Sequence, residues 1–286
     1  MAGLVPPLSG STKTDAEFST IATSTSCPAL CRASTPYFFE TEQDVDGRDK
    51  PGHDGVMIER MSKTVALVAV LLALISAPAR AQPVTDLLLV LAVDASGSVN
   101  MERFNLQKQG YAAAFRHPRV LNAIRSGSTQ SIAVTMTQWT GPALNIQVVP
   151  WTLIKNEATT TAFADAIEKA PRQLFSGGTS ISGAIDFAML LLPSAPFRGL
   201  KRVIDISGDG SNNRGRIVTE ARDDAVRQGV VINGLPILSL EPNLDRYYFN
   251  HVIGGPGSFM IPAESYETFA SAVLKKLILE IAANDR

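Results

Sequence analysis

The sequence predicts an α/β domain with a doubly wound, mostly parallel central sheet flanked by helices. From residue 85 onward, apolar segments of strand length alternate with amphipathic segments of helical length, the pattern of successive βαβ units. The segment 87–93 (LLLVLAV) is apolar throughout, as expected for a parallel strand that is buried on both faces of a sheet. A single domain over residues 82–286 accounts for both observations.

The strands are predicted from short apolar or alternating segments. Residues 131–139 alternate in polarity and are rich in β-branched side chains. Residues 146–154 follow them after a Gly141-Pro142 pair, which predicts a hairpin-like turn. The expected strands are residues 87–93, 131–139, 146–154, 200–207, 230–238 and 259–262.

Helices are predicted between these strands. Residues 181–192 carry a stripe of apolar side chains at helical spacing, and residues 216–228 form a charged segment of helical length. His117, which precedes Pro118, is expected at a helix end. The expected helices are residues 101–115, 161–169, 181–192, 216–228 and 266–282.

The composition speaks against one class of partner and one class of metal site. The formal net charge is −1 and the pI is near 6.3, so the chain lacks the basic excess that attracts nucleic acid, and no nucleic-acid partner is expected. Cys27 and Cys31 precede the predicted domain and have no His or Cys group at zinc-site spacing nearby. Neither cysteine is interpreted as a metal ligand.

Residues 61–81 have the three-part pattern of a secretory signal peptide. Lys63 lies near the start, an apolar run occupies residues 64–75, and residues 79–81 (ARA) form a small-x-small cleavage site. An apolar run of about a dozen residues is shorter than the roughly 20 that span a bilayer. We therefore expect cleavage after Ala81, no stable membrane span afterwards, and a periplasmic or secreted mature protein.

Residues 1–60 precede this signal and show no helical or strand period. They are rich in Ser, Thr, Pro and charged residues, and the run at residues 46–55 (DGRDKPGHDG) resembles translated intergenic repeat sequence found in some bacterial genomes. We expect translation to begin at Met61, with residues 1–60 a mis-annotated leader. The alternative is a genuine disordered leader.

Oxygen-bearing side chains lie in three separate loops next to predicted strands and helices. Asp94, Ser96 and Ser98 stand at alternate positions just after the first strand, so an extended segment points them in one direction. Thr179 follows a Gly-Gly pair at the entry to a helix, and Asp209 lies in a Gly-Asp-Gly loop after the fourth strand. Ligands bind at the carboxyl ends of strands in open α/β sheets, so these three loops are expected to converge on one crevice.

The five side chains offer two carboxylates and three hydroxyls, with no nitrogen or sulfur donor. Mg²⁺ takes such oxygen ligands together with water, and Mn²⁺ accepts the same set. Five side chains seldom all bind directly, so one carboxylate is expected to act through water and a position remains for a ligand from outside. The sequence therefore predicts a Mg²⁺ (or Mn²⁺) site at Asp94, Ser96, Ser98, Thr179 and Asp209.

These motifs resemble the metal-ion-dependent adhesion site of von Willebrand factor A domains, in which Asp-x-Ser-x-Ser, a Thr after paired glycines and an Asp in a Gly-Asp-Gly turn follow in this order. All five positions match, and the resemblance runs from about Pro83 to the end of the chain. Residues 177–180 (GGTS) and 207–213 (SGDGSNN) most resemble an uncharacterised exported bacterial branch of that superfamily. The resemblance implies a von Willebrand factor A or Rossmann-like fold with these five residues as metal ligands.

The resemblance also implies a function. Together with the predicted signal, it indicates an exported, non-enzymatic binding module in which a protein partner's Asp or Glu completes the shell of the cation. A helix that begins soon after Ser98 would point its positive end toward the site, which favours an arriving anion. Asp94 and Asp209 would offset the repulsion that the same helix exerts on the cation.

Two alternatives belong to other classes. The first is a metal-dependent phosphatase of haloacid-dehalogenase type with Asp94 as nucleophile. That layout requires a second Asp two residues later, where this chain has Ser96, and its lysine motif is not found. The second is a structural or assembly factor whose metal site is vestigial. Serine hydrolysis is disfavoured because the chain has no Gly-x-Ser-x-Gly elbow.

Two further features have more than one interpretation. Arg214 and Arg216, with Asn212 and Asn213, either line the metal crevice and steer an acidic partner or form a solvated helix start. Asp205 is a carboxylate inside an otherwise apolar strand. It either supports the metal ligands or makes a hydrogen bond at a strand edge.

Overall fold

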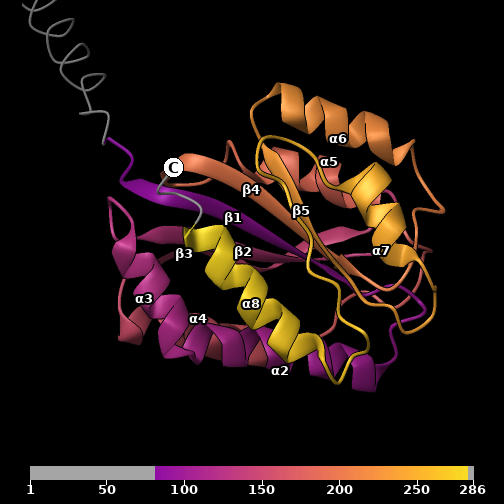
Figure 1. The fold of residues 1–286 in the computed structure, drawn as a ribbon, viewed down its shortest axis with the longest axis horizontal. Coiled ribbons are helices and arrows are strands. Elements are labelled where there is room, and N and C mark those ends of the chain that lie inside the picture. Colours follow the sequence, from indigo (N-terminus) through magenta and orange to yellow (C-terminus); the bar gives the residue numbers. More distant parts are fainter. Residues whose placement is uncertain (1–80, 283–286) are drawn as a thin grey trace, which may run out of the picture. The chain divides into compact units, whose positions relative to one another are not determined.

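The computed structural model describes residues 81–282, which are built around a five-stranded sheet (Figure 1). The strands are β1 (Val84–Asp94), β2 (Ile132–Trp139), β3 (Asn145–Ile154), β4 (Arg198–Gly208) and β5 (Val231–Pro236). They lie in the order β3-β2-β1-β4-β5. All neighbours pair in parallel except β2 and β3, which are antiparallel. The mostly parallel sheet and the hairpin predicted from the sequence are both confirmed.

Helices cover both faces of the sheet (Figure 1). They are α2 (Met101–Arg116), α3 (Pro118–Ser126), α4 (Glu157–Lys169), α5 (Ile181–Leu191), α6 (Val218–Arg227), α7 (Leu244–Tyr247) with the π-helical turn η1 (Tyr248–Val252), and α8 (Phe269–Ala282). Helices α2, α3, α4 and α8 lie on one face, and α5, α6 and α7 lie on the other. The doubly wound architecture is therefore the one expected from the βαβ pattern.

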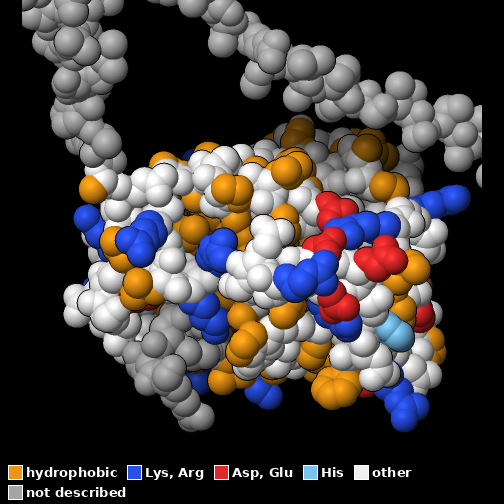
Figure 2. Space-filling model, turned by 90° about the horizontal axis from the view of Figure 1, so that it is seen from above, with side chains coloured by type: hydrophobic (Ala, Val, Ile, Leu, Met, Phe, Trp, Pro, Cys, Tyr) orange, Lys and Arg blue, Asp and Glu red, His pale blue; other side chains and the backbone are white. Residues whose placement is uncertain are grey.

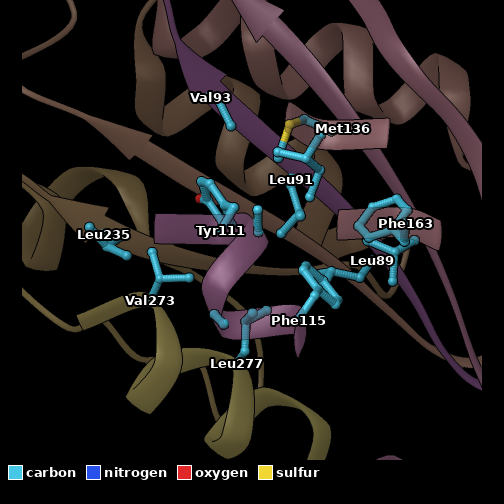
Figure 3. Packing of buried hydrophobic residues seen from close by; sticks show 14 of the residues in the cluster. Leu89, Leu91, Val93, Tyr111, Phe115, Met136, Phe163, Leu235, Val273 and Leu277 are labelled. Atoms are coloured by element: carbon cyan, nitrogen blue, oxygen red, sulfur yellow. The ribbon is translucent and has the colours of Figure 1, made fainter. Parts of the chain in front are cut away.

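The central strand β1 explains why its sequence is apolar without interruption. Leu89 and Leu91 point into the core beneath α2, α4 and α8, where they meet Tyr111 and Phe115 (Figure 3). Leu88, Val90 and Ala92 point to the opposite face and pack with α5 and α6. Successive side chains of a strand point to opposite faces, so a strand covered on both sides needs apolar residues at every position.

The structure differs from the expected elements at three places. Residues 259–262 are not a strand, because they contact β5 only through isolated bridges such as Gly234 with Met260. Helices α3 and α7 were not expected. His117 does lie at a helix end, as expected, and its imidazole Nδ1 also accepts a hydrogen bond from the Arg119 N–H at the start of α3.

The predicted leader and signal peptide together cover residues 1–81. Only Ala81 of these lies within the described residues. None of the helices within residues 81–282 is long and apolar enough to cross a membrane.

A buried ion-pair cluster joins α8 to the sheet. Lys276 Nζ lies 2.7 Å from Asp205 Oδ1 and 2.5 Å from Glu280 Oε1, and all three side chains are buried. Asn233 donates a hydrogen bond to Glu280 from the adjacent strand β5. Because β4 lies between β1 and β5, Asp205 is not at a sheet edge, and its partner is this lysine. Burial, followed by the nearby Glu280, raises the pKa of Asp205, whereas Lys276 opposes the increase.

We predict that Lys276→Met lowers the free energy of unfolding by about 3–5 kcal/mol, because it leaves two carboxylates buried without a cation. A carboxyl whose pKa is raised on folding is more easily kept neutral at low pH, and it stabilises the fold less as the pH increases. The decrease in unfolding free energy caused by Lys276→Met should therefore be smaller at about pH 5 than at about pH 8. Urea denaturation of the variant at both pH values measures this. Lys275→Met, on the exposed side of α8, is the matched control and should change stability little. Equal effects of the two variants would contradict the prediction.

Candidate metal site

The parallel pairing of β1 and β4 places two of the predicted ligands at the same end of the sheet, where both strands have their carboxyl ends. The two strands are in register up to Val93 and Ser207, so Asp94 and Asp209 leave neighbouring strands at their carboxyl ends. Both carboxylates are buried. Thr179 reaches the same edge from the start of α5.

Hydrogen bonds connect four of the five predicted residues. The Ser96 N–H donates to Asp94 Oδ1 at 2.7 Å, and the hydroxyl oxygens of Ser96 and Ser98 are 3.0 Å apart. Ser98 donates its own proton to Asp209 Oδ1 at 2.6 Å, so Ser96 is the donor of the bond between the two serines. The structure therefore links the Asp-x-Ser-x-Ser segment directly to the Gly-Asp-Gly loop.

Thr179 lies beside this chain of hydrogen bonds without belonging to it. A Cβ atom added at Gly210 would lie 3.7 Å from Thr179 Oγ1, which places that hydroxyl next to the loop of Asp209. The Thr179 backbone is fixed by Asn213, whose N–H donates to the Thr179 carbonyl at 2.9 Å and whose side-chain oxygen accepts from the Thr179 N–H at 3.0 Å. All five predicted residues thus lie around one point at the carboxyl ends of β1 and β4.

One oxygen of Asp94 is left without a partner in the described part of the chain. Asp94 Oδ2 is buried and accepts no hydrogen bond, although its sister oxygen is bonded. Burial, followed by repulsion from Asp209, raises the pKa of Asp94 to about 7. Gly208 leaves the room for this oxygen, because a Cβ there would approach Asp94 Oδ2 to 3.0 Å. An orphaned carboxylate oxygen among oxygen donors fits a hard divalent cation.

Only two of the five predicted metal ligands are carboxylates. Within residues 81–282 no group of three or more His, Cys, Asp or Glu side chains is arranged to hold a metal ion. Glu241 is a further carboxylate near the Asp209 loop, because a Cβ added at Gly210 would lie 3.9 Å from Glu241 Oε2. This oxygen accepts a hydrogen bond from the Ser211 N–H. A metal site here would therefore depend on hydroxyl oxygens as much as on carboxylates.

Three side chains that support the two carboxylates were not predicted. Tyr266 donates to Asp209 Oδ2 at 2.8 Å, and its pKa is raised by burial and by Asp209, so it remains a donor. Arg103 Nη1 lies 3.9 Å from Asp209 Oδ2 and donates to the Ser98 carbonyl, and Gln107 donates to the Asp94 carbonyl. The two α2 residues follow the motif within a few turns of helix, which is a usable signal in the sequence. Tyr266 precedes α8 and offers no such signal.

Two helices begin at the site. The N-cap of α2 is Asn100, which follows the Asp-x-Ser-x-Ser segment closely, and the N-cap of α5 is Ser180, which follows Thr179 directly. Both caps use their side-chain oxygen to accept a backbone N–H. The partial positive charge of both helix N-termini is therefore directed at this sheet edge, where it favours an anion.

Arg214 and Arg216, which the sequence left with the same two interpretations, differ in their contacts. Arg216 forms ion pairs with Asp186 and Asp224. Figure 2 shows acidic and basic side chains gathered together on the face that carries α5 and α6. Asn212 accepts from the Ser182 N–H and donates to the Arg216 carbonyl, so it fixes the start of α5. Arg214 is exposed and forms no ion pair within residues 81–282.

A comparison with family models identifies a family for the domain. Residues 84–285 match the family described as "Protein of unknown function (DUF1194)". The chain belongs to this family. No curated protein matches the sequence of this DUF1194 member significantly.

Solved structures with TM-scores of 0.50 and above share the fold of the DUF1194 domain. Proximal thread matrix protein 1 from the mussel byssus, in a form with a zinc-occupied MIDAS motif, has a TM-score of 0.52 at 14% identity, covering 69% of this chain and 46% of that chain. The pilus adhesin SpaC from Lactobacillus rhamnosus GG has a TM-score of 0.50 at 16% identity, covering 71% of this chain and 31% of that chain. A von Willebrand factor type A structure from Catenulispora acidiphila has a TM-score of 0.47 at 13% identity, covering 70% and 43%.

The chain spans less than half the length of each of these structures. At such low identity the likeness concerns the fold alone. The expected von Willebrand factor A-like α/β fold of the DUF1194 domain is confirmed. The roles of the five predicted ligands stay a prediction.

We predict that Asp94→Asn raises the free energy of unfolding of the metal-free protein by about 1–3 kcal/mol at about pH 8, because it removes a buried charge that has an unpartnered oxygen. The same substitution should abolish the stabilisation that Mg²⁺ or Mn²⁺ gives the unaltered protein. Urea denaturation with EDTA and with each metal measures both effects.

The matched control is Asp86→Asn. Asp86 accepts hydrogen bonds from Ser128 and Thr129, and its pKa is lowered, so losing its charge should destabilise the fold and leave the metal effect intact. A metal effect that survives in Asp94→Asn would refute the assignment of Asp94.

Proposed function

We propose that this protein is an exported, non-enzymatic binding module that uses a divalent cation to capture an acidic group of a protein partner. The cation would be Mg²⁺ or Mn²⁺, held by Asp94, Ser96, Ser98, Thr179 and Asp209. The observation that carries the proposal is the buried, unpartnered oxygen of Asp94 within a set of donors that are all oxygens. The partner would supply an Asp or Glu carboxylate.

The chain's own residues suit the capture of an anion. Asp94 and Asp209 would balance the charge of the cation, while the hydroxyls of Ser96 and Ser98 add ligand oxygens without adding negative charge. When bound, the cation would supply an open coordination position for a carboxylate from outside. The N-termini of α2 and α5 favour the same arriving anion.

The similar structures and the predicted signal peptide support the same reading. The mussel protein is described with a zinc-occupied MIDAS motif, and the Lactobacillus protein is a pilus adhesin. The signal pattern at residues 61–81 supports export to the periplasm or the exterior. The non-enzymatic assignment is supported by Ser96, which stands where a phosphatase of the alternative type needs an acidic residue.

We predict that the tagged protein retains an envelope protein in Mg²⁺ and releases it in EDTA, because the captured carboxylate is held through the cation. An aspartate-containing peptide in excess should displace the retained protein, whereas the same peptide with asparagine should not. Quantitative mass spectrometry of the eluates measures retention and displacement.

Two variants control this experiment. Asp94→Asn should lose the retained protein, and Asp86→Asn, remote from the site, should keep it. Retention that is undiminished in EDTA or in Asp94→Asn would overturn the proposal.

We predict no phosphatase activity in the wild type or in Ser96→Asp with any divalent metal. In the enzymatic alternative this substitution would restore the missing acid/base group, which is typically worth about 10²- to 10⁴-fold in rate. In the binding module it adds a third carboxylate and weakens the attraction for a partner's acidic group. Hydrolysis of a phosphate ester, assayed with Mg²⁺ and Mn²⁺, decides between them. Metal-dependent turnover that disappears in Asp94→Asn would establish the enzyme instead.

A further inference from the structure

Two surface cavities of similar size flank the candidate site and differ in charge. The first, of about 520 Å³, is lined by Glu102, Glu264 and Glu267 together with Arg103 and Tyr266. Its arginine is directed at Asp209. Hydrogen bonds from the Ser265 side chain and from the Glu267 backbone, followed by the charge of Arg103, lower the pKa of Glu267. This cavity therefore presents three carboxylates around one cation that is already engaged, and it repels an acidic group.

The second cavity, also of about 520 Å³, lies on the Thr179 side of the site and has no Asp or Glu among its lining residues. We call it the Arg214 cavity. Residues 212–219 form one wall, and Tyr247 and His251 form another. Asn213 belongs to this wall and is hydrogen-bonded to the backbone of Thr179, so the cavity adjoins the candidate ligands.

Arg214 is the free cation of this cavity among the described residues. Its neighbour Arg216 has its guanidinium bound by Asp186 and Asp224. The Arg214 side chain makes no ion pair or hydrogen bond within residues 81–282, whereas its backbone N–H donates to the Thr179 carbonyl at 3.2 Å. The side chain lies over Gly178. A Cβ added at Gly178 would meet Arg214 Cγ at 2.7 Å and Nε at 3.4 Å. The guanidinium group therefore lies beside Gly178, the residue before Thr179, and its donors are available.

A second arginine contacts the loop that carries the candidate ligands. Arg172 donates from Nη2 to the carbonyls of Ala95 and Ser96, at 3.0 and 3.1 Å, and stacks on Phe175 with its Cζ 5.0 Å from the ring centre. No carboxylate pairs with it in the part of the chain that the structure describes. Arg172 acts as a positioning residue, because its bonds fix the loop that carries Ser96.

We propose that the Arg214 cavity binds a second acidic side chain of the partner, so that the captured segment presents two carboxylates. This inference rests on the proposed function, in which the first carboxylate goes to the cation. The charge difference between the two cavities also sets the direction of the segment, with its second acidic group toward Arg214 and away from Glu264 and Glu267. Like charges would oppose the reverse direction.

The test compares labelled peptides that carry one aspartate with peptides that carry a second aspartate one to four residues before or after it. Binding to the full protein is measured by fluorescence anisotropy in Mg²⁺ or Mn²⁺. At least one two-aspartate peptide should bind about three- to tenfold more tightly than the one-aspartate peptide, as expected for a partly exposed ion pair. The preference should shrink as the salt concentration increases.

Arg214→Gln should remove this preference while leaving the affinity for the one-aspartate peptide within about twofold. Calorimetry should show that the variant binds Mg²⁺ or Mn²⁺ at least as tightly as the wild type, because a repelling cation has been removed. Arg125→Gln is the matched control and should keep the preference, since Arg125 is exposed near the end of α3, shortly before the amino end of β2, whereas the candidate ligands follow the carboxyl ends of β1 and β4.

The outcomes separate this inference from the proposed function. Metal-dependent binding of the one-aspartate peptide without any preference for a second aspartate, or a preference that persists in Arg214→Gln, overturns the Arg214 cavity alone. Failure of the metal-loaded protein to bind any of these peptides overturns both proposals.

Discussion

The parallel pairing of β1 with β4 is the constraint on which the candidate site depends. Because the two strands run in the same direction and in register, Asp94 and Asp209 emerge side by side where the strands end. The same pairing requires helices on both faces, which is why β1 is apolar at each position from residue 87 to residue 93. Burial of both faces then leaves the carboxyl edge as the place where buried strands open onto polar loops.

Two buried carboxylates at one edge create an electrostatic cost that the surrounding residues reduce only in part. Asp209 is well supported, because Ser98 and Tyr266 donate to its two oxygens and Arg103 lies 3.9 Å away. Asp94 receives a hydrogen bond on one oxygen only, and its pKa is raised to about 7. An external cation would therefore stabilise Asp94 more than Asp209.

Sequence reasoning predicted the sheet and the convergence of the five oxygen-bearing residues because both depend on local patterns, and the role of these residues as metal ligands stays a prediction. Apolar strands are recognised from their composition. The motif residues lie directly at strand and helix ends, as Asp94 and Thr179 do. It missed what depends on tertiary packing. Helix α7 is too short to have its own periodic signal, the bond from Tyr266 to Asp209 joins distant segments, and residues 259–262 pair with β5 only through isolated bridges.

Burial of a carboxylate is not in itself evidence of a binding site, and β4 shows why. Asp205 lies within β4 and Asp209 directly follows the strand, and both carboxylates are buried. Asp205 has its cation within the chain, because Lys276 reaches it from α8. No lysine or arginine forms an ion pair with Asp94 in the described residues. A cation from outside would do for Asp94 what Lys276 does for Asp205, with the difference that it leaves coordination positions open to a partner.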